Sequence, residues 1–156
     1  MVKAVVRKSV KSDCGKLSPI LRLADRREVI AHSGHGAKVG LEIALDSSDE
    51  CWSVEYEEEP IAMFGYLLDS ANGANVWMLG SDKIQDIKWQ FLRESKHWLN
   101  TIAKDFDRLW AVADVRNTTH ANWYRWLGFD ITATIHAGPF GLPFYYIEYT
   151  GGVNHV

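Results

Sequence analysis

The spacing of apolar residues changes period twice along the chain, and this restricts the fold class more than any other feature. Near the middle of the chain Trp52, Val54 and Tyr56 alternate with polar residues, the pattern of a half-buried β-strand. Over Asp82–Phe106 the apolar residues recur every three or four positions, which predicts the longest helix of the protein. A chain that combines both periods is expected to build a mixed α/β (α+β) domain.

Further segments place strands and helices on either side of these two. Strands are predicted at Val2–Arg7, Cys51–Tyr56, Ile61–Leu68, Val76–Leu79, Leu109–Val115, Ile131–Ala137 and Phe144–Tyr149. Helices are predicted after N-cap residues Ser12 and Asp13, within Lys16–Ile30 with a second start near Asp25 and Glu28, at Lys38–Leu45, at Asp82–Phe106, and from Thr118 to a stop at Gly128. We expect a mostly antiparallel sheet of six or seven strands flanked by about four helices.

Length and charge limit the classes of partner. The chain has 156 residues, so a single domain over 1–156 is expected. Its net charge is −3 and its Lys and Arg residues are scattered, which argues against a nucleic-acid surface. No apolar run approaches the roughly 20 residues of a membrane-spanning helix, and no signal peptide is evident. With only Cys14 and Cys51 present, we expect a protein of the reducing cytoplasm.

The most specific motif is the run from Asn117 to Phe129, NTTHANWYRWLGF. Its pattern of Asn, six residues, Tyr, three residues and Gly-Phe resembles a segment of the GNAT family of acyl-CoA N-acyltransferases. The order of the predicted elements is similar to the GNAT fold over nearly the whole chain. The resemblance therefore implies an enzyme that transfers an acetyl group from acetyl-CoA to an amine of a protein or small molecule.

The resemblance also implies roles for individual residues. The Asn117 amide is expected to hydrogen-bond the acyl-CoA arm, and the Tyr124 phenol to protonate the departing CoA thiolate. The family splays its fourth and fifth strands apart, so the backbone near Met78 and Leu79 is expected to pair with the pantetheine amides. The general base for the acceptor amine is not identified by the sequence.

The segment after the fourth strand departs from the family pattern. GNAT enzymes place glycines there, whose backbone N–H groups hold the pyrophosphate at a helix N-terminus. In this chain Ile87 and Trp89 fall near the expected glycine positions. We expect Lys83 and Lys88 to replace the missing loop in part, as point charges that attract the phosphates.

A narrower resemblance covers most of the chain. The segments LRLADRREVIAHSG, CWSVEYEEEPIAMFGYLL, WMLGSDKI and VRNTTHANWYRWLGF are similar to a bacteriophage family of GNAT-like proteins, some of which are internal virion proteins A of short-tailed phages. This implies a phage protein in the host cytoplasm or the virion, with a host or phage protein as partner and a homodimer left open. It also supplies the alternative function, a virion or host-interaction binding module without catalysis.

Each candidate residue has a structural interpretation beside the functional one. Tyr124 can pack an amphipathic helix, and Asn117 can cap one. His32 and His35 are spaced like metal ligands, but no third ligand lies nearby in the sequence, so no metal site is predicted.

Overall fold

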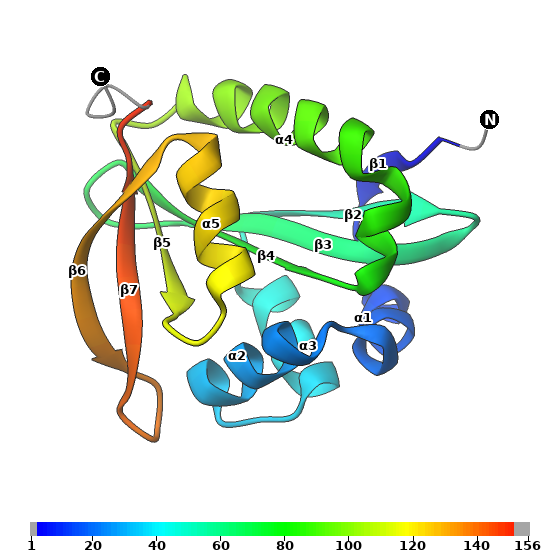
Figure 1. Ribbon diagram of the computed structural model, residues 1–156, viewed down its shortest axis with the longest axis horizontal. Coiled ribbons are helices and arrows are strands. Elements are labelled where there is room, and N and C mark those ends of the chain that lie inside the picture. The colour runs from blue at the N-terminus through cyan, green and yellow to red at the C-terminus, as the bar shows by residue number, and fades with distance from the viewer. Residues whose placement is uncertain (1–2, 152–156) are drawn as a thin grey trace.

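The computed structural model describes residues 3–151, which form a seven-stranded mixed sheet with helices on both faces (Figure 1). The strands are β1 Val5–Lys8, β2 Glu50–Tyr56, β3 Glu59–Leu68, β4 Gly73–Gly80, β5 Arg108–Asp114, β6 Phe129–Ala137 and β7 Leu142–Tyr149. The helices are α1 Lys11–Leu17, α2 Leu23–Ser33, α3 Ala37–Ser47, α4 Lys88–Ala103 and α5 Thr118–Leu127, with 3₁₀ turns η1 Ser18–Ile20 and η2 Asp82–Ile87. The predicted fold class is confirmed.

The sheet divides at the contact between β4 and β5. The strand order is β1-β2-β3-β4-β5-β7-β6, and every neighbouring pair is antiparallel except β4 and β5. These two strands run parallel and pair only at Gly73–Asn75 with Arg108–Trp110. Beyond Asn75 they diverge, as Figure 1 shows. The splay that the GNAT resemblance implies is therefore present.

Two helical layers cover the sheet. On one face α4 and α5 bury Leu99, Ile102 and Leu127 against β4 and β5. On the other face α1–α3 bury Leu17 and Leu41 against β2, β3 and β4. Each layer removes apolar side chains from water on its own side, which fixes both faces of the splayed strands.

The start of the first helix differs from the prediction. Ser12 and Asp13 are not N-cap residues, because α1 begins at Lys11 and Val10 occupies the cap. Asp13 is instead the third residue of the helix, where its carboxylate accepts the backbone N–H of Val10 at 3.0 Å. The same carboxylate also binds the Arg7 guanidinium at 2.8 and 2.9 Å. A buried carboxylate thus ties the first helix to the first strand.

The long helix predicted at Asp82–Phe106 is interrupted. Residues Asp82–Ile87 form a 3₁₀ turn, and the α-helix runs only over Lys88–Ala103. Ile87 explains the break, since its side chain is buried against the sheet while its backbone caps α4.

The predicted residue Val2 lies outside the described part of the chain. Within residues 3–151 no helix has the length and hydropathy to cross a bilayer.

Candidate functional site

A cavity of about 200 Å³ lies where β4 and β5 diverge. Its wall on the β4 side is Val76–Leu79, directly beyond the last β4–β5 pair. Helix α5 contributes His120 and Tyr124, and α2 contributes Glu28 and His32. We call this space the splay cavity.

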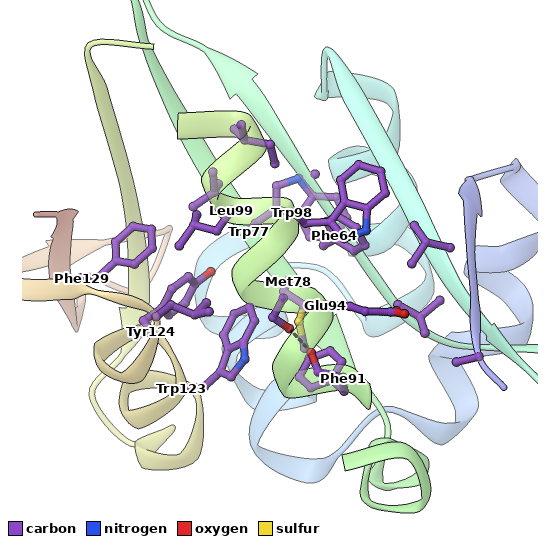
Figure 2. A pocket seen from close by; sticks show the side chains of 18 of the residues that line it. Phe64, Trp77, Met78, Phe91, Glu94, Trp98, Leu99, Trp123, Tyr124 and Phe129 are labelled. Atoms are coloured by element: carbon purple, nitrogen blue, oxygen red, sulfur yellow. Dashed lines mark hydrogen bonds between the residues drawn. The ribbon is translucent and has the colours of Figure 1, made fainter. Parts of the chain in front are cut away.

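A second, apolar cavity of about 70 Å³ lies on the α4 side of the sheet (Figure 2). Its wall includes Phe64, Phe91 and Trp98 from the sheet and α4, and it shares Met78 and Tyr124 with the splay cavity. The end of β4 and the middle of α5 therefore separate the two cavities. Tyr124 is the one titratable side chain common to both walls among the described residues.

Tyr124 is almost fully buried, at 2% exposure. Its ring packs edge-on against Phe129 and lies 4.7 Å, centroid to centroid, from the ring of His120. Burial raises the pKa of Tyr124 well above its usual value, and the nearby carboxylates of Glu28 and Asp25 add to the increase. The phenol is therefore protonated over the whole physiological range.

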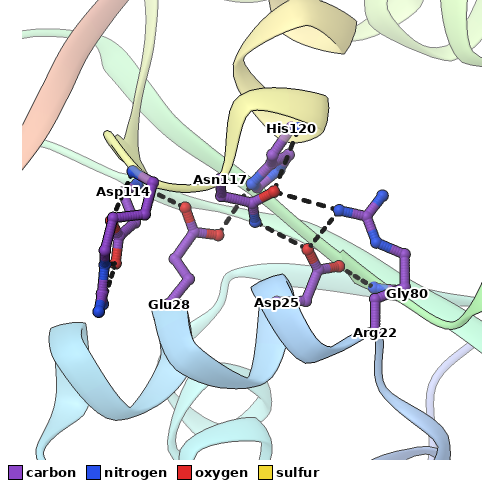
Figure 3. Close-up of polar contacts among 8 residues, drawn as sticks. Arg22, Asp25, Glu28, Gly80, Asp114, Asn117 and His120 are labelled. Carbon is purple, nitrogen blue, oxygen red and sulfur yellow. Dashed lines mark hydrogen bonds and ion pairs between the residues drawn. The ribbon is translucent and has the colours of Figure 1, made fainter.

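Asn117 is the N-cap residue of α5, and its side chain lies in a buried polar network (Figure 3). Its Oδ1 accepts the backbone N–H of His120 at 3.3 Å and an N–H of Arg22 at 3.1 Å, while its Nδ2 donates to Asp25 at 2.8 Å. The structure thus confirms that Asn117 caps a helix. Its amide is committed to α2 and α5 and does not line either cavity.

Two carboxylates of α2 bridge the diverging strands. Asp25 accepts the backbone N–H of Gly80, at the end of β4, at 2.8 Å. Glu28 accepts the backbone N–H of Asp114, at the end of β5, at 2.6 Å. Because both acceptors stand one turn apart on α2, this helix spans the open side of the splay and sets its width.

Glu28 also binds a histidine. Its second oxygen lies 2.8 Å from His120 Nδ1. The other ring nitrogen of His120 and the indole Nε1 of Trp123 are the two buried side-chain nitrogens without a hydrogen-bond partner in the described chain. Burial alone would lower the pKa of His120, but the charge and hydrogen bond of Glu28, with Asp25 beyond it, outweigh burial and raise it.

Asp25, Glu28 and His120 bring three metal-ligand atoms within 4.8 Å of one another. The hydrogen bonds described above already engage all four carboxylate oxygens. The guanidinium of Arg22, 3.1 Å from Asp25, adds a positive charge that opposes a cation. The carboxylates of the cluster are therefore fully engaged in hydrogen bonds, and we assign no metal to it.

The predicted backbone contacts, Met78 and Leu79, pair with β3 but lie in the part of β4 that is not paired with β5, and they line the splay cavity. Lys83 and Lys88 lie elsewhere, exposed on η2 and at the first residue of α4. The structure thus brings Met78 and Leu79 together with Tyr124, while the two lysines stand beyond the end of β4 and do not line the cavity.

Hydrogen bonds and side chains within the protein fill the segment that follows β4. The N–H of Ser81 donates to Ile61, and the N–H of Lys83 donates to the Ser81 hydroxyl. Ile87 is buried, and Trp89 is 77% exposed with Lys88 Nζ 5.5 Å from its ring centre. Side chains thus occupy the positions where the GNAT pattern has bare backbone.

The sequence did not reveal the α2 contribution to the site. Asp25 and Glu28 were interpreted as helix-start residues, whereas both are buried and face the splay. The available signal was two acidic residues one turn apart on the side of the helix that carries the buried Val29. Glu28 and His120 are 92 residues apart, so no local spacing links them.

No model of a known protein family matches the sequence, and neither does any curated protein. Solved structures do match. A GNAT-family acetyltransferase from Bacillus anthracis has a TM-score of 0.70 at 13% identity, covering 97% of this chain and 99% of the other. AAC(6')-Ib in complex with ribostamycin and coenzyme A has a TM-score of 0.67 at 15% identity, covering 98% and 96%.

A chimera of spermidine N-acetyltransferase SpeG from Vibrio cholerae and hSSAT has a TM-score of 0.65 at 10% identity, covering 96% of each chain. At such low identity the likeness establishes the architecture alone. Together with the splayed strands, these matches show that the chain has the fold of the GNAT acetyltransferases.

Proposed function

We propose that this protein is an N-acetyltransferase that moves an acetyl group from acetyl-CoA to an amine. The observation that carries the proposal is the position of Tyr124, a protonated phenol in the wall of a cavity between splayed β4 and β5. Structural neighbours in complex with coenzyme A support the donor. Neighbours named for spermidine and for aminoglycoside acetylation support an amine as the acceptor.

The reaction needs a proton at the leaving group. The amine nitrogen attacks the thioester carbonyl, a C–N bond forms, the C–S bond breaks, and the sulfur takes up a proton to give the thiol. Tyr124 is the group placed to deliver it. Because its pKa lies above that of an ordinary thiol, donation alone would be uphill. We expect Tyr124 to take the proton from the attacking nitrogen as it gives its own to sulfur.

The protein suits the thioester arm of acetyl-CoA better than its phosphates. The unpaired edge at Met78 and Leu79 and the cavity beside it suit the extended thioester arm. The phosphates meet Ile87 and Trp89 in place of a glycine loop, which leaves Lys83 and Lys88 as candidates to attract them. We therefore expect CoA to bind more weakly than to a protein with the glycine loop.

Isothermal titration with acetyl-CoA and CoA, followed by assay of acetyl transfer to a panel of amines, tests the function. The expected result is micromolar binding and transfer to at least one amine. No binding at millimolar concentration would overturn the proposal.

The second candidate is a binding module of a phage that keeps the fold without catalysis. The closed connection after β4 favours it, and absence of CoA binding would support it. Phage origin, residence in the host cytoplasm or virion, and a homodimer are proposed for the protein under either function. They rest on the sequence resemblance, and size-exclusion chromatography with light scattering tests the oligomeric state.

A further inference from the structure

The base that activates the acceptor amine remains to be identified, and His120 has the surroundings that such a base requires. The ring is 6% exposed and forms part of the splay cavity wall, one helical turn before Tyr124. Its Nδ1 is held 2.8 Å from Glu28, and its Nε2 has no partner. When the ring is neutral, Nδ1 carries the proton that Glu28 accepts, which leaves the lone pair on Nε2.

Glu28 is itself held in place. Its other oxygen accepts the backbone N–H of Asp114 at 2.6 Å, so the carboxylate cannot turn away from the imidazole. A base oriented by a carboxylate that is anchored in turn is the arrangement by which enzymes select one tautomer of histidine. Glu28 is therefore a positioning residue.

The other titratable groups in the splay cavity wall are less suited. Glu28 has both oxygens engaged. Tyr124 has a raised pKa and stays protonated. His32 is exposed and packs edge-on against Phe144, with no carboxylate bound to its ring in the described chain. His32 is therefore the competing candidate.

We infer that His120 is the general base of the proposed acetyl transfer. Its Nε2 takes one proton from the ammonium form of the acceptor and so frees the nitrogen lone pair for attack on the thioester. The second nitrogen proton reaches the sulfur through Tyr124, and His120 later releases its proton to water. The net products are the N-acetyl amine, free CoA thiol and one proton.

This role rests on the proposed function and makes the rate depend on pH. Glu28 and Asp25 favour the protonated ring, while Arg22 opposes it. The net result is a raised pKa, so kcat/KM for the amine should rise with pH above about 6.5 as Nε2 loses its proton. Tyr124 does not titrate in this range.

The experiment compares pH profiles of kcat/KM for wild-type protein, His120→Gln, Glu28→Gln and His32→Gln. We expect His120→Gln to lower kcat/KM by roughly 10²- to 10⁴-fold. Its pH profile should also lack the decline on the acid side. Glu28→Gln should move the acid limb to lower pH, because the charge that favours the imidazolium is gone. His97→Gln, on the exposed face of α4, is the matched control and should leave the profile unchanged.

A second readout needs no substrate. Nitrogen-15 spectra of the imidazoles in the unliganded protein should show His120 as the Nδ1–H tautomer above its pKa, and a lower pKa in Glu28→Gln. The Nε2–H tautomer would overturn the inference, and so would an acid limb that disappears in His32→Gln and persists in His120→Gln. Wild-type protein that acetylates no amine would instead overturn the proposed function itself.

Discussion

Tyr124 lies in the cavity wall, and its raised pKa keeps the phenol protonated at physiological pH. If it delivers that proton to sulfur, Tyr124→Phe should lower kcat by roughly 10²-fold or more and leave CoA affinity nearly unchanged. Steady-state kinetics with isothermal titration of CoA measure both quantities. Trp126→Phe, on the exposed side of the same helix, is the control. An unaltered kcat in Tyr124→Phe would reduce Tyr124 to a packing residue.

Gly128 ends α5 with φ of 109°, in the region that side chains rarely adopt. Gly128→Val should therefore destabilise the fold by about 1–3 kcal/mol, whether or not the protein is an enzyme. Urea unfolding measures the difference. Gly128→Asn should cost less, because Asn tolerates positive φ better than a β-branched residue. Equal stability of the two variants would contradict this explanation.

At the scale of elements, Asn117 joins the start of α5 to α2. Asn117→Ala leaves Asp25 and Arg22 with one partner fewer each and removes the α5 cap, so we expect a loss of about 1–3 kcal/mol in the free energy of unfolding. Thermal and chemical unfolding measure it, with exposed Asn122→Ala as the control. The sequence predicts weaker CoA binding in the same variant, and titration of the folded fraction tests that separately.

The segment from η2 into α4 carries the predicted phosphate contacts. Lys83→Gln combined with Lys88→Gln should weaken CoA binding without lowering kcat, because the lysines stand away from the splay cavity. Titrations at two salt concentrations measure the effect, which should shrink as salt screens the charges. Lys104→Gln, beyond the other end of α4, removes one positive charge away from this segment and is the control for a loss of charge alone. Unchanged affinity in the double variant would exclude both lysines.

How far the sequence predicts an element depends on how local its causes are. Leu109–Val115 was recognisable as a buried strand, and Gly128 as a helix stop, because period and conformation are properties of short segments. The break at Ile87 was not recognisable, since it depends on burial against β-strands far away in sequence. The same holds for the site. Tyr124 belongs to a motif, whereas Glu28 acquires its role only when folding brings it to His120.

At the scale of the whole molecule, two buried groups give the stability opposite pH dependences. The raised pKa of His120 means that the folded state binds its proton more tightly, so this contribution is complete below about pH 6.5 and is lost as pH rises through the folded-state value. Burial would raise the pKa of Asp13, but hydrogen bonds from Arg7, Val10 and Ser53 lower it. That contribution is complete above about pH 3.9 and is lost in acid.

We therefore expect the free energy of unfolding to be highest between about pH 4 and 6.5. Urea unfolding at a series of pH values measures the profile. His120→Gln should make its alkaline side shallower. Asp13→Asn should make its acid side shallower without removing it, because the pKa values of Asp69 and Asp114 are lowered as well. A profile that keeps its full alkaline decline in His120→Gln would assign that decline to another group.

The bridge that Asp25 and Glu28 build between Gly80 and Asp114 has a consequence for how the protein opens. The sheet is two ribbons, β1–β4 and β5–β7, and a short run of parallel pairing is their only ladder contact in residues 3–151. Because α2 also links their free ends, we expect the two ribbons to exchange their amide hydrogens as one cooperative unit. Breaking this link at Asp25 and Glu28 should split the unit in two, so that the β5–β7 ribbon loses its protection before the rest of the sheet.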